Sequence, residues 1–133
     1  MIRLSALMPL AAAALLAGCA TDSGGEPAPS IPGGESCDVS ISFGSYAMGI
    51  DGDAYARVET WLAAHKDLVT DVEVTPWGRE GERTVCVMTS SPAAIKPVFS
   101  GVVKQLPAVG KKAPITAMSR TGGHFQTKGG PGA

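Results

Sequence analysis

Hydrophobic and polar residues alternate strictly where the central part of the chain begins. The apolar positions are every second residue of segment 37–43: Cys37, Val39, Ile41 and Phe43. Successive side chains of a β-strand point to opposite faces, so a period of two indicates a strand with one buried face. The pattern therefore predicts the first strand over residues 37–43.

Two later stretches have the spacing of amphipathic helices instead. One begins after Asp51, which is suited to be an N-cap, and continues to about His65, with apolar positions at Ala54, Val58, Trp61 and Leu62. The other follows Ser91-Pro92 and repeats apolar side chains at helical intervals: Ile95, Val98, Phe99, Val102, Val103 and Leu106. Pro97 interrupts it, so this helix either kinks there or begins near Lys96.

The remaining ordered segments predict strands. Leu68–Thr75 and Glu82–Thr89 are rich in β-branched residues and flank a turn sequence at 76–81, which is typical of a β-hairpin. Lys111–Arg120 supplies a last strand at a sheet edge, where Pro114 is tolerated. The resulting order within residues 37–120 is β-α-β-β-α-β. We therefore expect an α+β, ferredoxin-like fold, a four-stranded antiparallel sheet with two helices on one face.

The N-terminal residues 1–18 have the features of a signal peptide. Arg3 is followed by an apolar run from Leu4 to Ala17 that contains Pro9. A membrane-spanning helix needs roughly 20 apolar residues, so this run is too short to be a permanent span. We expect residues 1–18 to direct secretion.

The end of this run resembles the lipobox of bacterial lipoprotein precursors, in the sequence Leu16-Ala17-Gly18-Cys19. The resemblance implies cleavage before Cys19 and attachment of lipid to Cys19, which would anchor the chain in the bilayer. Ala20 in place of aspartate favours, by the same resemblance, the periplasmic face of the outer membrane. The alternative is ordinary secretory cleavage, which would leave Cys19 as a thiol.

Flexible composition flanks the expected domain. Residues 19–36 comprise the lipidated cysteine and a stretch rich in Gly, Pro and Ser, which predicts a disordered tether. Residues 121–133 predict a disordered Gly-rich tail. With Cys19 lipidated, Cys37 and Cys86 remain as an even pair in an oxidising compartment. In the expected topology the first and third strands are adjacent, so a Cys37–Cys86 disulfide is predicted.

Composition and motifs argue against several classes of function. A net charge of −1 and few aromatic residues do not favour nucleic acid as a partner. The His and Cys residues lack zinc-site spacing, no phosphate-binding or nucleophile motif occurs, and both domain cysteines are assigned to the disulfide. We expect no metal, no cofactor and no enzymatic activity; an enzyme of unidentified class is the second alternative.

Charge is segregated along the chain. Residues 20–82 carry twelve acidic and three basic side chains, whereas residues 83–133 carry seven basic and no acidic ones. The two halves interleave in a β-α-β-β-α-β fold, which would mix these charges in space. Alternatively, Lys104, Lys111, Lys112 and Arg120 form a basic patch toward anionic lipid or cell-wall polymer.

The candidate binding surface is the sheet face opposite the helices. We expect it to carry alternate residues of three strands: Asp38, Ser40, Ser42, Val69, Asp71, Glu73, Val85 and Val87. Trp77 and Arg79, in the hairpin turn, would flank this face, and aromatic and Arg side chains are typical binding anchors. The leading hypothesis is therefore a non-enzymatic interaction module that contacts an envelope protein or another envelope component.

A second family resemblance supplies the first alternative. The segment Val39–Tyr46, which ends in a Gly-Ser-aromatic step and is followed by a helix, a hairpin and a second helix, resembles SPOR domains over residues 37–106. The resemblance implies binding of peptidoglycan glycan strands on the open face of the sheet.

Overall fold

The computed structural model describes residues 36–130 of the chain. In chain order the elements are β1 (Val39–Phe43), α1 (Gly52–Ala64), β2 (Val69–Pro76), β3 (Arg83–Thr89), the 3₁₀ turn η1 (Pro92–Ala94), α2 (Ile95–Val103), β4 (Ile115–Ser119) and β5 (His124–Gln126). The fold is α+β, with one antiparallel sheet and two helices. The predicted signal peptide, Cys19 and nearly all of the tether lie outside the described residues.

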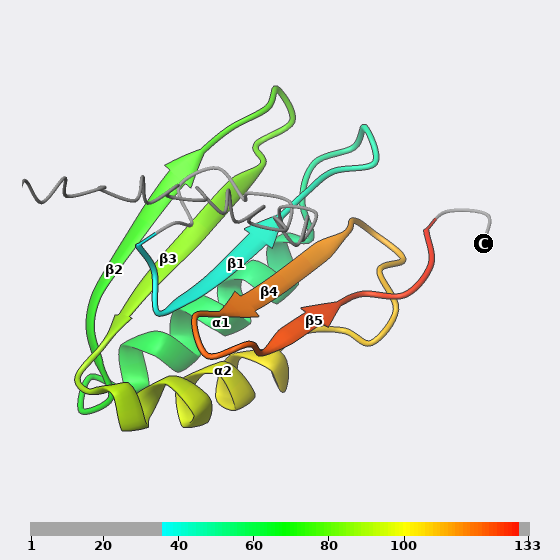
Figure 1. Cartoon of the computed structure of the whole chain (residues 1–133). Coiled ribbons are helices and arrows are strands. Elements are labelled where there is room, and N and C mark those ends of the chain that lie inside the picture. The colour runs from blue at the N-terminus through cyan, green and yellow to red at the C-terminus, as the bar shows by residue number, and fades with distance from the viewer. Residues whose placement is uncertain (1–35, 131–133) are drawn as a thin grey trace, which may run out of the picture.

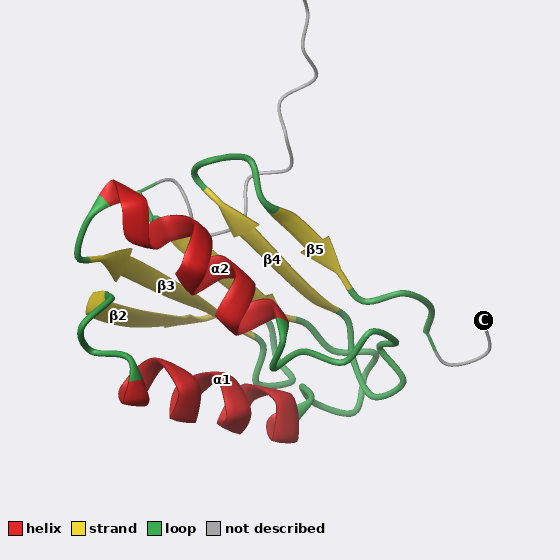
Figure 2. Ribbon diagram, turned by 90° about the horizontal axis from the view of Figure 1, so that it is seen from below, coloured by secondary structure: helices red, strands yellow, loops and turns green. Residues whose placement is uncertain are grey.

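The sheet has five strands in the order β2-β3-β1-β4-β5, and every neighbouring pair is antiparallel. Both helices lie on one side of it, as Figures 1 and 2 show. β1 is the central strand, whereas β2 and β5 are the two edges. Each edge strand has hydrogen-bonding groups on one side that no strand of the sheet takes up.

The fifth strand corrects the sequence-based expectation of four strands and a disordered tail over residues 121–133. β5 pairs with β4, and the chain after it is held at Thr127. The Ile115 N–H donates to Thr127 Oγ1 at 3.0 Å, and the Thr127 N–H donates to the Ile115 carbonyl at 3.0 Å. Phe125 also packs against the core. One aromatic and one threonine side chain thus order a segment whose glycines indicated disorder.

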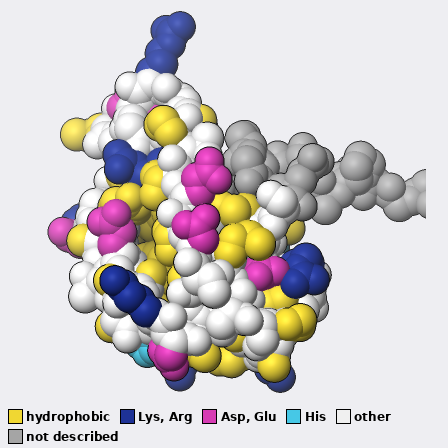
Figure 3. Space-filling model, turned by 90° about the vertical axis from the view of Figure 1, so that its left-hand side faces the viewer, with side chains coloured by type: hydrophobic (Ala, Val, Ile, Leu, Met, Phe, Trp, Pro, Cys, Tyr) yellow, Lys and Arg dark blue, Asp and Glu magenta, His cyan; other side chains and the backbone are white. Residues whose placement is uncertain are grey.

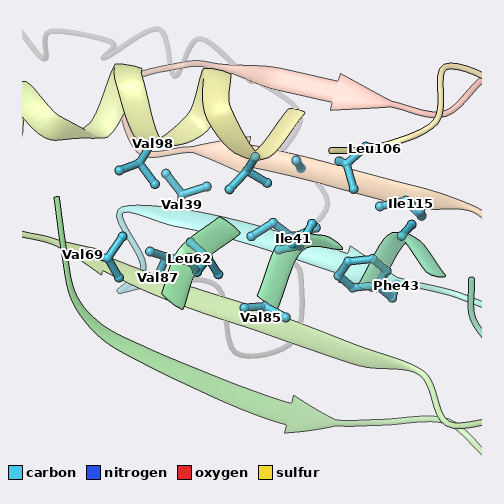
Figure 4. Packing of buried hydrophobic residues seen from close by; sticks show 14 of the residues in the cluster. Val39, Ile41, Phe43, Leu62, Val69, Val85, Val87, Val98, Leu106 and Ile115 are labelled. Atoms are coloured by element: carbon cyan, nitrogen blue, oxygen red, sulfur yellow. The ribbon is translucent and has the colours of Figure 1, made fainter. Parts of the chain in front are cut away.

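The hydrophobic core lies between the sheet and the helices (Figure 4). The predicted inward residues of β1, Val39, Ile41 and Phe43, are all fully buried. The helices contribute the positions that their periodicity predicted: Ala54, Val58, Leu62, Ile95, Val98 and Val102. Burial of such side chains stabilises the fold by roughly 1.5–3 kcal/mol each.

The starts of the two helices follow from local chemistry. Asp51 is the N-cap of α1, and its carboxylate accepts the Ala54 N–H at 3.1 Å, as the sequence predicted. Before α2, the 3₁₀ turn at Pro92–Ala94 leads directly into the helix at Ile95. Pro97 is the third residue of α2, where no intrahelical partner is required for its missing N–H. The helix therefore begins near Lys96 rather than kinking there.

The helices approach each other closely at Gly101 of α2. A β-carbon added there would lie 2.0 Å from Cζ2 of Trp61 on α1, so the indole occupies the space that any larger residue at position 101 would need. Trp61 also stacks on His65, with ring centroids 3.9 Å apart. Glycine at position 101 thus allows the Trp61 indole of α1 to pack directly against α2.

The structure contains the predicted Cys37–Cys86 disulfide, with the two Cα atoms 5.3 Å apart. In the β1–β3 register the residue opposite Cys86 is Ser40, three positions after Cys37. The chain before Val39 therefore bends back over the face of the sheet that is turned away from the helices. The bridge fastens this entering segment to β3.

Acidic and basic residues that are segregated in sequence are neighbours in the fold. Within residues 36–130 the ion pairs are Lys112–Asp53 and Arg120–Asp38, and each joins the acidic part of the chain to the basic part. The interleaved topology thus mixes the charges. None of the helices in this range combines the length and apolar composition needed to cross a membrane.

Candidate binding site

The register of the sheet places the predicted site residues on two different faces. Ser40 lies opposite Cys86 and Met118, and Ser42 lies opposite Thr84 and Thr116. These six residues lie on the distal face, the side of the sheet turned away from both helices. Asp71 and Glu73 of β2 lie on the same face, as expected. Ser40 and Ser42 are therefore on the face on which they were expected.

Val85 and Val87 are not on the distal face, and this part of the prediction is wrong. They pair with Ile41 and Val39 of β1, whose side chains point toward the helices, and they are 1% and 0% exposed. Val69 was also assigned to that face and is a buried member of the core. These valines belong to the hydrophobic core and not to the distal face.

The distal face is not a free polar surface. Ser40, Thr84 and Cys86 on it are all buried. The half-buried Trp77 lies over one end of it, and its Nε1–H donates to Thr84 Oγ1 at 3.1 Å. The predicted anchor Trp77 is thus held by the hairpin itself, whereas Arg79 is exposed at the hairpin tip.

Asp38, at the other end of the sheet, is also held by structural contacts. Its Oδ2 accepts the N–H and the hydroxyl of Thr89, both at 2.8 Å, while Arg120 donates two hydrogen bonds to Oδ1. The backbone N–H of Thr89 and the bonds from Arg120 lower the pKa of Asp38, although burial acts in the opposite direction. This carboxylate joins strands and is not directed at a ligand.

An open groove of about 720 Å³ lies between α1 and β2. One face of the helix and the turn after it form its first wall, with Glu59, Leu62, Ala63 and Lys66. The sheet forms the second wall, with Val69 to Val72, Val74 and Val85. Figure 3 shows hydrophobic side chains in this hollow, with acidic side chains beside it. We refer to it as the α1–β2 groove.

The groove exists because β2 is an edge strand that the helices do not cover. Val72 and Val74 pair with Val87 and Val85, so their side chains point toward the helix side of the sheet. They are nevertheless 40% exposed, whereas their partners in β3 are fully buried. Two adjacent valines on the core side of the sheet are thus left in contact with solvent.

The backbone of β2 is open at the same place. The Asp38 N–H donates to the Val87 carbonyl at 3.1 Å, so Val87 directs its hydrogen-bonding groups toward β1. By the alternation of antiparallel ladders, Val72, which lies opposite Val87, directs its N–H and carbonyl away from β3, and so does Val74. The Val72 N–H instead donates to Oδ1 of the neighbouring Asp71 at 2.9 Å.

The charges around the groove are predominantly acidic. Glu59 and Asp71 line it. Asp71 and Glu73 both belong to the distal face of the edge strand, and Asp71 reaches the edge itself, where its Oδ1 accepts the Val72 N–H. Lys66 is the basic residue among those that line it, and it belongs to the turn where β2 is about to begin. The middle and far end of β2 therefore combine apolar side chains, backbone groups directed away from β3 and negative charge.

Sequence reasoning missed Val72 and Val74 as surface residues. They alternate with Asp71 and Glu73, which is the signal of a strand with one apolar face. That pattern identifies their face correctly, but it does not show that neither helix covers this strand.

A second, shallower hollow beside α1 is lined by Arg57, Trp61, His65 and Gln105, among others. Its aromatic residues have structural partners. His65 is the C-cap of α1, and its Nδ1 bonds to the Trp61 carbonyl at 2.7 Å. The Arg57 Nε–H donates to the Gln105 carbonyl at 2.9 Å. These contacts close the end of the helix.

The groove contains no arrangement of residues typical of catalysis. Apart from Thr70, its side chains are apolar or singly charged, and within residues 36–130 no cluster of three His, Cys, Asp or Glu residues could hold a metal ion. What the groove offers is an apolar floor beside a row of backbone donors and acceptors. Comparison with known proteins returns no family model, no curated protein and no solved structure that matches this chain.

Proposed function

We propose that this chain is a lipid-anchored periplasmic lipoprotein whose folded domain is a non-enzymatic binding module, and that the α1–β2 groove is its partner-binding site. The observation that carries the proposal is the 40% exposure of Val72 and Val74 beside the uncovered edge of β2. Exposed apolar side chains gathered in a groove are typical of interaction surfaces.

The anchoring part of the proposal rests on the lipobox at Leu16–Cys19 and on the cysteine count. The Cys37–Cys86 disulfide is compatible with an oxidising compartment and accounts for both cysteines of the domain. Lipid on Cys19 would account for the third. The destination we propose is the periplasmic face of the outer membrane.

We also propose that β1-α1-β2-β3-α2-β4 is a ferredoxin-like unit to which β5 is an addition. The strand order β2-β3-β1-β4 within the sheet supports this assignment. A SPOR-like mode of glycan binding would use the distal face. The burial of Ser40 and Thr84 on that face favours the α1–β2 groove instead.

The anchor is tested by the intact mass and fractionation of the protein from cells. The parent chain should begin at Cys19, carry acyl groups and leave the membrane only in detergent. Cys19→Ser should accumulate as unprocessed precursor or appear in the soluble fraction. Unchanged processing and membrane attachment in Cys19→Ser would refute the anchor assignment.

The binding site is tested by photo-crosslinking in cells from position 63, which lines the groove, with position 96 on α2 as a matched exposed control. Position 63 should give a discrete crosslinked product with an envelope protein, and position 96 should not. The double variant Val72→Asp/Val74→Asp should reduce that product about tenfold, because it places charge on the apolar floor. Equal capture from both positions, or capture unaffected by the double variant, would refute the site.

A further inference from the structure

We infer that the partner of the α1–β2 groove is an extended protein segment that adds to β2 as a sixth strand and alternates apolar with basic side chains. This inference rests on the proposed binding function and assigns the chemistry of the partner. It combines the outward backbone groups of β2, the direction of its side chains and the charge beside it.

The backbone of β2 offers a place for another strand. Val72 and Val74 both direct their N–H and carbonyl away from β3, on the side where no strand formed by residues 36–130 lies. An extended segment laid antiparallel along this edge would form a hydrogen-bonded pair with each valine. Addition of a strand to an open edge beside a helix is an established way to recognise extended peptides.

Side-chain direction then specifies every second residue of the incoming segment. The residues opposite Val72 and Val74 would point toward α1, into the groove that Leu62 and Val85 line. Apolar side chains are required there. The residues between them would point to the other face of the sheet, opposite Asp71 and Glu73 of β2.

The charge requirement follows from the Asp71 carboxylate. It accepts the outward Val72 N–H at 2.9 Å, and a carbonyl of an incoming strand must take that N–H in its place. The displaced carboxylate remains beside the new strand, close to Glu73. A lysine or arginine on the incoming strand would pair with it, whereas an acidic residue would be repelled.

Other occupants fit less well. Two copies of β2 placed antiparallel across a two-fold axis centred on Val72 would bring Asp71 of one copy opposite Glu73 of the other. An axis centred on Glu73 would bring the two Glu73 side chains together. The chain's own residues 20–35 contain Asp22, Glu26 and Glu35 and no basic residue, so their charge does not complement the site either.

The experiment uses the processed full chain in detergent and three synthetic ten-residue peptides. The first alternates valine and lysine, the second alternates valine and glutamate, and the third has the composition of the first with valines and lysines in separate blocks. Affinity is measured by fluorescence anisotropy, and hydrogen exchange of the protein is followed at residue resolution. The alternating Val/Lys peptide should bind about tenfold more tightly than either control. It should also slow exchange of the Val72 and Val74 amides.

Three variants separate strand addition from nonspecific attraction. Val74→Pro removes an outward N–H without removing a bond to β3, so it should abolish protection at position 72 and weaken binding about tenfold. Val74→Thr keeps the N–H and the β-branched shape and should retain the protection. Asp71→Lys/Glu73→Lys should reverse the preference, so that the Val/Glu peptide binds better; because both residues are exposed, this variant serves if Val74→Pro fails to fold.

The results distinguish this inference from the function on which it rests. Equal binding of the alternating and block peptides, or binding without protection of Val72 and Val74, would overturn strand addition. If groove-dependent crosslinking persisted in that case, the binding function would stand with a partner of different chemistry. If crosslinking failed as well, both would be refuted.

Discussion

Arg120 donates two hydrogen bonds to a single oxygen of Asp38, from Nε at 2.9 Å and from Nη2 at 2.7 Å. The two residues are 82 positions apart in sequence, and they join the chain just before β1 to the chain just after β4. The other oxygen of Asp38 holds Thr89 at the end of β3. One buried carboxylate thus fastens three adjacent strands at the same end of the sheet.

This arrangement predicts acid sensitivity. The pKa of Asp38 is lowered in the folded chain, chiefly by the Thr89 N–H, so folding favours the ionised form. Its contribution to the free energy of unfolding is therefore full above the ordinary Asp pKa of 3.8 and is lost as the pH falls through that value toward the lower folded one. Asp38→Asn should lower stability at pH 7 by about 2 kcal/mol and flatten its decline below pH 4. Urea unfolding at several pH values measures both effects, and parallel curves for parent and variant would contradict the assignment.

Loss of the disulfide should destabilise the domain strongly. The bridge closes a loop with a sequence separation of 49, and chain entropy assigns about 4 kcal/mol to a loop of that size. Cys86→Ser and Cys37→Ser should lower the midpoint of denaturation equally, and the double variant should add little to either. Calorimetry under non-reducing conditions makes the comparison. Recovery of free thiols at both positions from envelope-derived protein would show that the bridge does not form in cells.

The same substitution at two glycines should have opposite effects. Gly101→Ala should cost about 1–3 kcal/mol, because its β-carbon would meet the indole of Trp61 at 2.0 Å. Gly52→Ala, in the first turn of α1, meets no atom within 4 Å and should be neutral or stabilise by up to about 1 kcal/mol. Thermal unfolding distinguishes the two variants. Adding Trp61→Leu should restore part of the stability lost at position 101, and if it does not, the clash is not the cause.

Substitutions of Trp77 and Arg79 should differ in their effect on stability, because Trp77 has a structural contact and Arg79 is exposed. Trp77→Phe keeps an aromatic ring but removes the N–H that Thr84 accepts, so it should lower the free energy of unfolding by about 1 kcal/mol. Arg79→Ala changes an exposed residue at the hairpin tip and should alter stability by less than about 0.5 kcal/mol. Chemical denaturation tests both. Equal losses in the two variants would mean that the indole hydrogen bond contributes nothing.

The order and type of most elements could be predicted from the sequence because each has a pronounced period. The alternation ending at Phe43 and the helical spacing from Ile95 to Val102 both correspond to buried faces in the structure. β5 could not be predicted in this way. It has only three residues, too few to show a period. The contacts that order it come from β4, the core and Thr127, and the sequence of β5 itself does not indicate them.

The candidate site was harder to predict because it depends on which strand pairs with which. β3 is apolar on both faces, with Val85 and Val87 on one and Cys86 and Met88 on the other, so its own pattern does not reveal which face is buried. Pairing with Ile41 and Val39 decides it. The exposure of Val72 and Val74 depends on where the helices lie, and the sequence of β2 does not indicate where that is.

If the chain is anchored through Cys19, as we propose, the Cys37–Cys86 bridge determines where a pull from the membrane first acts on the domain. Tension arriving along the polypeptide at Cys37 is transmitted covalently to Cys86, inside β3, before it can act on the hydrogen bonds of β1. Without the bridge, the same pull would act on the first residue of the central strand and unzip its bonds to β3 and β4 one at a time. With the bridge, the pull acts on β3 as well as on β1, so the first residues of β1 cannot separate from β3 on their own.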